Sequence, residues 1–353
     1  MSVINEFLEY LQVNRNRSAS TVATYRPLLV RLEKFLLEDK KALLTATVRD
    51  LELWTGPALH KEGLDARTRA KAVSAVRSFF SWAERAGLVS RSPAGALHRP
   101  KLPDSLPSAW TLEQAEKLIW APDLTTFKGV RDAAILAFLV ATGCRVSGLV
   151  GLNETDIWSE EIDGERWAFA QLREKGAKSR KVPLPKLALV PLLMYLGHDE
   201  RQALDEGRHH LRVDDTRVMF CNLRAGKCPS HEWYGERRRL TRRAVWGLIK
   251  WYGRQECIPE HLLHPHAARH LMGTHLYDEG IAQEDRMAMM GHQRPETLGI
   301  YTRLSRKRLL QIAGKSNPLA AIKTPFDDLA EVVGGPAPAS TVSIKKQNAY
   351  KGK

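Results

Sequence analysis

Histidine and arginine side chains that could bind an anion or a metal gather in one stretch near the C-terminal end of the chain. Six of the 12 histidines lie within residues 261–292. The proline in "HPHAARH" suits the first turn of a helix, on which His266, Arg269 and His270 stand at i, i+3 and i+4 and share one face. Further on, "MGHQRPETLGIY" ends one helix and displays Tyr301 on the next.

Three interpretations of this stretch compete. A zinc site suits clustered histidines, but carboxylates are poorly placed nearby and the arginines would repel a cation. A second interpretation gives the histidines no joint role, and we favour it for His264 and His275. In the third, the arginines, the histidines and Tyr301 bind a phosphodiester whose negative charge grows in the transition state. Tyrosine can be the nucleophile in such a site.

Another arginine follows an apolar helix. The pattern predicts a helix over residues 131–142 that turns at Gly143, and Arg145 comes two residues later in "TGCRVSGL". An arginine beside packed core is unfavourable unless an anion meets it. Arg145 is therefore a second candidate for holding an anionic partner.

Composition favours a globular protein with a polyanionic partner. The chain has 353 residues, enough for two domains, and a formal net charge of +14, which favours nucleic acid over other partners. A basic protein without such a partner is the alternative. The sequence has no apolar run long enough to span a membrane and no signal-peptide pattern, so we expect a cytoplasmic protein. The spacing of the four cysteines predicts free thiols, and Cys221, Cys228 and His231 are spaced poorly for zinc.

The first hundred residues predict only helices. Apolar periodicity indicates helices over 4–11, 18–39, 47–62 and 65–87, the last opened by Asp65 and closed at Gly87. Its first turns carry Arg67, Arg69 and Lys71, either on a solvated face or against DNA, and its core face holds Val73, Val76, Phe80 and Trp82.

A proline-rich stretch then separates two domains. We assign residues 1–95 to a helical DNA-binding domain, 96–110 to a linker, 111–315 to a second domain and 316–353 to a C-terminal tail that is a candidate interaction segment. In the second domain, residues 166–172 and 179–185 alternate like strands of a small antiparallel sheet, joined by the turn "REKGAK".

Five arginines fall within residues 237–243, before an aromatic helical segment. A capped helix with a solvated basic end is one interpretation. We favour phosphate contacts, because so dense a run of guanidinium groups matches a nucleic-acid backbone. The residues assigned to DNA binding here are Arg238, Arg239, Arg242 and Arg243.

Four blocks, "TGCRVSGL", "REKGAKSRKVPLP", "HPHAARH" and "MGHQRPETLGIY", resemble in order the four motifs of tyrosine recombinases, the phage integrase family, including its Xer-like members. The resemblance covers residues 1 to about 315. It implies a mainly α fold, with an N-terminal core-binding (SAM-like) domain and a mixed α/β catalytic domain that holds a small antiparallel sheet. It also implies site-specific recombination: integration or excision of a mobile element, or resolution of a replicon.

The resemblance assigns roles to individual residues. Arg145 and Arg269 match the two family arginines that hold the scissile phosphate, and His292 would add a hydrogen bond to the same oxygens. Tyr301 would attack phosphorus and form a 3′-phosphotyrosine, while His266 would help to take the phenol proton. A cation-rich pocket assists ionisation of a phenol whose free pKa is about 10.

The same resemblance concerns the leaving group, cofactors and partners. Lys175 would protonate the departing 5′ oxygen, with Lys178 as the alternative for that role and otherwise a DNA contact. No cofactor, metal or ATP is implied. The implied partners are double-stranded DNA recombination sites and three further copies of this chain, forming a tetramer on two paired sites from a monomer or weak oligomer. The resemblance also allows accessory DNA-binding proteins as partners. It implies a bacterial protein that is associated with the nucleoid.

Gly148 departs from the family pattern, which has an acidic residue three positions after the first arginine. It is the only support for an alternative function, a DNA-binding family member with impaired catalysis that acts as a regulator or accessory protein. Two further rivals are a metal-dependent nuclease and a relaxing topoisomerase of related chemistry.

Overall fold

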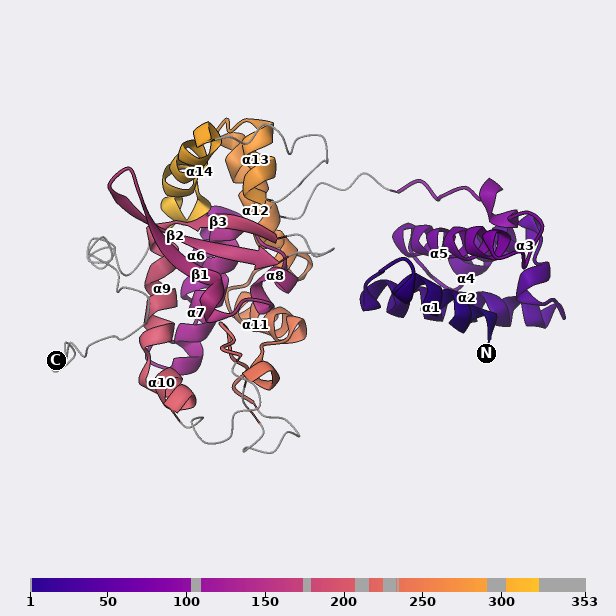
Figure 1. The fold of residues 1–353 in the computed structure, drawn as a ribbon, viewed down its shortest axis with the longest axis horizontal. Helices are drawn as coiled ribbons and strands as arrows, with labels where there is room; N and C mark the ends of the chain where they lie inside the picture. Colours follow the sequence, from indigo (N-terminus) through magenta and orange to yellow (C-terminus); the bar gives the residue numbers. More distant parts are fainter. Residues whose placement is uncertain are drawn as a thin grey trace. The chain divides into compact units, whose positions relative to one another are not determined.

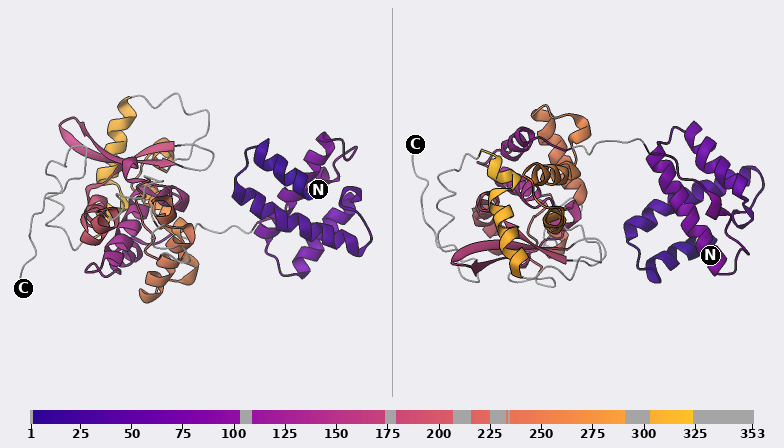
Figure 2. Two further views of the ribbon diagram at one scale, coloured as in Figure 1. Left: turned by 60° about the horizontal axis from the view of Figure 1, so that its bottom comes forward. Right: turned by 90° about the horizontal axis from the view of Figure 1, so that it is seen from above.

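The computed structural model describes residues 2–102, 109–173, 179–206, 216–224, 233, 235–290 and 303–323. The chain forms two compact units, residues 1–106 and 107–353, and each is described by itself. In its described part the first unit is helical, whereas the second combines helices with a small sheet (Figures 1 and 2).

The described part of the N-terminal unit holds the helices α1 (Val3–Val13), α2 (Ala19–Glu38), α3 (Val48–Leu53), α4 (Leu59–Lys61) and α5 (Ala66–Arg85). Side chains that accept a hydrogen bond from the first turn begin three of them: Ser18, Thr47 and Asp65. Between α3 and α4 the chain makes a π-helical turn, Trp54–Ala58, at the Gly–Pro pair that interrupts the predicted segment.

The core of this unit lies between α1, α2 and α5. Phe7 of α1 meets Phe79 of α5 edge-on, with ring centroids 5.4 Å apart. The predicted core face of α5 is confirmed, since its four members are buried: Val73, Val76, Phe80 and Trp82. Helix α2 continues through Pro27. The mainly helical fold predicted for this part of the chain is confirmed.

The stretch predicted as a linker, 96–110, contributes residues to both units. Leu97 is fully buried in the N-terminal core, and Trp110 is buried in the second unit, where its indole Nε1 donates to the Leu262 carbonyl at 2.9 Å. The described residues between these two anchors end at Leu102 and resume at Ala109.

The second unit is built around α7 (Phe127–Thr142), the predicted apolar helix. All but one of its residues are buried, and it contacts α6, α8, α9 and α12. A helix covered on all sides suits an apolar sequence, because each face then meets another apolar face. The bounds of the other helices are α6 (Leu112–Trp120), α8 (Val146–Val150), α9 (Lys186–Gly197), α10 (Asp199–Glu206), α11 (Arg242–Gln255), α12 (Pro265–Asp278), α13 (Gln283–Met290) and α14 (Arg303–Lys315).

A three-stranded antiparallel sheet of order β1-β2-β3 lies in this unit (Figure 1). Strands β2 (Glu165–Arg173) and β3 (Ser179–Leu184) confirm the predicted pair. Strand β1 (Ile157–Ile162) was not predicted. The Asp163–Gly164 turn that joins it to β2 has positive φ at both residues, 53° and 80°, as a tight hairpin requires.

Residues 316–323, assigned from sequence to the tail, pack into the core of the second unit. Asn317 is fully buried and donates from its side-chain amide to the Ala141 carbonyl at 2.8 Å. Leu319 and Ile322 join the main apolar cluster, and the Trp120 indole donates to the Lys323 carbonyl at 2.9 Å. No helix in the described residues has both the length and the apolar character needed to cross a bilayer.

Two helical glycines predict opposite responses to alanine. A Cβ at Gly148 would lie 3.6 Å from the Arg173 carbonyl oxygen, which is ordinary contact, whereas a Cβ at Gly129 would overlap the Asp123 carbonyl. We expect Gly148→Ala to raise the free energy of unfolding by about 0.5–1 kcal/mol, and Gly129→Ala to lower it by about 1–3 kcal/mol. Urea unfolding of both variants checks this, and equal shifts would contradict the described packing.

Candidate active site and DNA-binding residues

The turn after α7 presents the first candidate arginine. Gly143 ends α7 with a φ of +53°, and a Cβ there would approach the side chain of Met272 to 3.0 Å, so both conformation and space require glycine. Arg145 follows as the N-terminal flanking residue of α8, and its side chain is half-buried. The close approach of α7 to α12 brings this turn next to the histidine-bearing helix.

Helix α12 carries the second arginine and its histidines. As the sequence predicts, Pro265 occupies the first turn and Gly280, with a φ of +69°, follows the end of the helix. The His264 ring caps the N terminus, because its Nδ1 accepts from the Ala267 backbone N–H at 3.1 Å. Arg269 on this helix is 5% exposed, and the structure therefore buries it beside the end of α7.

Arg269 ties three segments together. One Nη group donates to the Gly143 carbonyl at 2.7 Å, and the other donates to the Met290 carbonyl at the end of α13 at 2.5 Å. These bonds hold the turn of Arg145 and the last residue of α13 against α12. They also fix the guanidinium plane, which orients its remaining donor groups.

Arg145, His266, Arg269 and His270 form one electrostatic unit, the arginine–histidine cluster. Partial desolvation lowers the pKa of His266, and the positive charges of His270, Arg269 and Arg145 lower it further. Desolvation and then Arg269 lower the pKa of His270 in the same way. Repulsion of this kind shows a positive potential, which favours an anion and disfavours a metal ion. Within the described residues, no group of three or more metal-ligating side chains converges.

His270 belongs to this cluster. Its spacing of four residues from His266 placed it on the same helix face from the sequence, although no individual role was assigned to it. A neutral His266 is able to accept a proton, and the lowered pKa keeps it neutral near pH 7. The cluster can therefore hold an anion with its guanidinium groups while an imidazole accepts a proton.

Four predicted site residues lie outside the described residues: Lys175, Lys178, His292 and Tyr301. Their flanking elements are described. Strands β2 and β3 bracket the two lysines, with Arg173 paired to Ser179, and α13 and α14 bracket His292 and Tyr301.

Both parts of the chain match known family models. Residues 4–87 match the phage integrase N-terminal SAM-like domain, and residues 109–308 match the phage integrase family. The chain belongs to the phage integrase family. Its relatives include the tyrosine recombinase XerD of Proteus mirabilis, which is 33% identical over 90% of this chain and 93% of its own length. XerD of Staphylococcus haemolyticus is 30% identical over 90% of this chain and 99% of its own.

Solved structures of integrase-family proteins share the fold. A post-cleavage complex of the XerH site-specific recombinase has a TM-score of 0.62 at 17% identity, covering 88% of this chain and 84% of its own. A lambda integrase tetramer bound to a Holliday junction has a TM-score of 0.53 at 15% identity, covering 85% and 79%. The predicted fold class is confirmed.

The structure corrects the role predicted for Arg239. Its Nη1 donates to the carbonyls of Val150 and Leu152 at 2.9 and 3.0 Å, and its Nη2 donates to the Asn153 side chain at 2.6 Å. Nε and Nη2 also donate to the two Glu236 carboxylate oxygens, at 2.7 and 2.6 Å. All five N–H groups of the guanidinium are thus used inside this integrase-family protein, and none is left for a phosphate.

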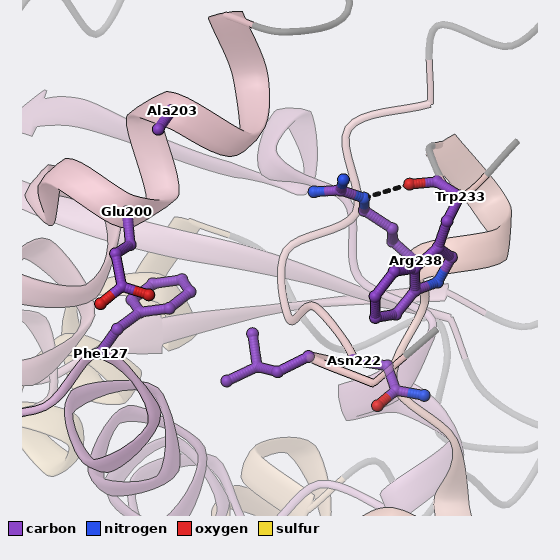
Figure 3. Close-up of a pocket in the computed structure, with 7 residues that line it drawn as sticks. Phe127, Glu200, Ala203, Asn222, Trp233 and Arg238 are labelled. Carbon is purple, nitrogen blue, oxygen red and sulfur yellow. Dashed lines mark hydrogen bonds between the residues drawn. The ribbon is translucent and has the colours of Figure 1, made fainter. Parts of the chain in front are cut away.

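Arg238 also turns back onto its own segment. Its Nε donates to the Trp233 carbonyl, and its guanidinium carbon lies 5.4 Å from the centre of the Trp233 ring (Figure 3). Both side chains line a pocket of about 340 Å³, with Phe127 and Glu200 on the opposite wall (Figure 3). None of the residues that line this pocket belongs to the arginine–histidine cluster.

The remaining predicted cations are more accessible. Arg242 and Arg243 are exposed in the first turn of α11, which Thr241 caps, and within the described part of the chain neither pairs with a carboxylate. Cations at a helix N terminus are unfavourable in the free protein, and a bound phosphate would reverse this effect. On α5, Arg67 and Lys71 are exposed and Arg69 is half-buried.

The lowered histidine pKa values predict that stability falls with acid. Desolvation and then neighbouring histidines lower the pKa of His264, whose neutral ring is also the helix cap. The unfolded chain binds more protons than the folded one, so this stability is complete above about pH 6.5 and is lost as pH falls below it. We expect urea unfolding to show less stability at about pH 5.5 than at about pH 7.5.

Two variants at one position separate titration from capping. His264→Asn keeps a cap without titrating, so its stability should depend less on pH than that of the natural chain. His264→Ala should show the same weakened dependence and lose about 1 kcal/mol relative to the natural chain at about pH 7.5, where the neutral ring caps the helix. A pH dependence that is unchanged in both variants would contradict this assignment.

Proposed function

We propose that this chain is a site-specific recombinase that cleaves and rejoins double-stranded DNA through a covalent 3′-phosphotyrosine at Tyr301. The observation that carries the proposal is the arginine–histidine cluster, in which the buried Arg269 bonds the Gly143 carbonyl at 2.7 Å and so ties the turn of Arg145 to the helix of His266. Membership of the phage integrase family and the tyrosine recombinases among its relatives support it.

The two arginines hold the scissile phosphate. Arg145 and Arg269 approach from α8 and α12, and a planar guanidinium can meet two phosphate oxygens at once. Their charge stabilises the negative charge that builds on the non-bridging oxygens as phosphorus becomes five-coordinate. His292 adds a hydrogen bond to the same oxygens.

Each strand exchange conserves the phosphodiester. The Tyr301 oxygen forms a bond to phosphorus as the bond to the 5′ oxygen breaks, His266 accepts the phenol proton, and Lys175 donates a proton to the leaving oxygen. Lys178 is the alternative donor. One phosphorus–oxygen bond forms for each that breaks, so rejoining by another 5′-hydroxyl needs no ATP.

Exchange between two duplexes requires several copies of the chain. The lambda integrase tetramer on a Holliday junction supports an assembly of four protomers on two paired sites. We infer a bacterial, cytoplasmic and nucleoid-associated setting, because the named relatives are bacterial and the substrate is DNA.

The alternative function depended on Gly148. The backbone there is helical, and the space beside it would admit a Cβ. Family membership and the tyrosine recombinases among the relatives support the enzyme, whereas Gly148 alone supports the regulator, so we retain the enzyme.

The covalent step gives a direct test. On a nicked suicide duplex, whose short cleaved strand diffuses away, the natural chain should form a denaturant-resistant protein–DNA adduct. Tyr301→Phe should form none, because it lacks the attacking oxygen. Arg145→Ala should form the adduct about 100- to 1000-fold more slowly while still binding DNA.

Two outcomes would oppose the proposal. An adduct that persists in Tyr301→Phe would place the nucleophile elsewhere. DNA cleavage without an adduct, abolished by a chelator, would indicate a metal-dependent nuclease. Recombination of a plasmid with two sites, compared with relaxation of a plasmid with none, separates a recombinase from a topoisomerase.

Substitutions within residues 237–243 should distinguish arginines that contact DNA from arginines that stabilise the fold. Replacing Arg242 and Arg243 by Gln should weaken DNA binding and reduce the slope of log K against log salt by up to about 2, at about 0.9 per phosphate contact. Arg239→Gln should keep the slope but lower the free energy of unfolding by about 1–3 kcal/mol, because the carbonyls of Val150 and Leu152 lose their hydrogen-bond donor. Salt titrations and urea unfolding of both variants give the answer, and a reduced slope in Arg239→Gln would contradict an internal role for this residue.

A further inference from the structure

The end of α13 is held by two guanidinium groups from different elements. Arg180 of β3 donates from Nη1 to the Met289 carbonyl, and Arg269 of α12 donates to the Met290 carbonyl at 2.5 Å. The last carbonyls of a helix lack intrahelical partners and carry partial negative charge, so cationic donors there are favourable. The two arginines thus fix the point at which the chain leaves α13.

The apolar contacts of α13 specify its position only loosely. Its buried Met289 and Met290 belong to a small cluster with α12 and α14, separate from the main core of the unit. Trp167 of β2 packs against this cluster, and α14 contacts β3. Methionine side chains are flexible and fill space without defining one geometry. Directional hydrogen bonds from Arg180 and Arg269 therefore supply much of the precision.

The position of two predicted catalytic residues makes that precision important. His292 comes two residues after Met290, and Tyr301 stands in the same segment before α14. Arg269 already belongs to the arginine–histidine cluster, whereas Arg180 does not. Arg180 instead stands on β3, the strand that begins directly after residues 174–178, which include Lys175 and Lys178.

We propose that Arg180 is a positioning residue, which fixes the end of α13 against β3 and so supports the attack of Tyr301 on the phosphate held by Arg145 and Arg269. The inference rests on the proposed function. Arg180 touches neither substrate nor reacting atoms in this scheme. Its loss should leave the fold largely intact, because it removes one hydrogen bond at a helix end while Arg269 still holds the neighbouring carbonyl.

The test uses the full chain and two versions of the suicide duplex. One has the natural 5′ oxygen at the scissile bond, and the other has sulfur there, whose thiolate leaves without a proton. Arg180→Gln should slow adduct formation by about 10- to 100-fold on both, as expected for a nucleophile displaced by about 1 Å. Lys175→Ala should be slow on oxygen and restored on sulfur.

Two controls keep the result specific. Lys181→Gln removes the next cation along β3, which pairs with Glu160 at 2.5 Å, and should cleave at the natural rate. Arg180→Lys retains a cationic donor and should recover part of the rate. It serves as the test variant if Arg180→Gln does not fold. Thermal midpoints and DNA affinity of the Arg180 variants should match the natural chain.

Each outcome separates the proposed function from the role of Arg180. If the natural chain forms no adduct, the proposed function fails. If the natural chain forms one and Arg180→Gln matches its rate, only the role of Arg180 is overturned. Restoration of the Arg180→Gln rate by sulfur would also overturn that role, because Arg180 would then act through the lysine that protonates the leaving oxygen.

Discussion

The candidate site depends on one guanidinium group that is bonded on two sides. Arg269 donates to the carbonyls of Gly143 and Met290, which lie 126 and 21 residues away in the sequence. It therefore has two functions, since the side chain proposed to bind phosphate also holds together the turn of Arg145 and the end of α13. A lysine could not do both, because it lacks the rigid fork that reaches two acceptors.

Charge in the candidate site bears on both proposed roles, phosphate binding and proton transfer. Burial, and then the neighbouring cations, lower the pKa of His266, and the same cations would attract a phosphate. Without DNA this arrangement is unfavourable, and backbone carbonyls such as that of Gly143 partly offset it. The positive potential of the arginine–histidine cluster is therefore present before an anion binds.

Local patterns predicted much of the fold, whereas long-range partners could not be predicted. The helical spacing of apolar residues predicted the core face of α5, and the alternation of apolar and polar residues predicted β2 and β3. Strand β1 was missed because its sequence, "IWSEEI", places glutamates at consecutive positions, although the following Asp–Gly pair was an available hairpin signal. The motif order gave Arg145, His266 and Arg269 as neighbours. The dense run of arginines at 237–243 was a poor guide to which of them can contact DNA. Nothing in the local sequence distinguishes a side chain that faces solvent from one, such as Arg239, that donates to distant carbonyls.

Guanidinium groups in this fold therefore divide into two populations. Arg131 and Arg201 are 7% and 1% exposed and donate to the carbonyls of Cys221 and Val218, so they act, like Arg239, as internal ties between loops and helices. Arg242 and Arg243 remain exposed. The formal charge of +14 counts both populations equally, although a buried arginine cannot exchange its partners for phosphates without unfolding its surroundings. Net charge thus indicates that DNA is a partner, but the distribution of arginines between carbonyls and solvent determines where DNA can bind.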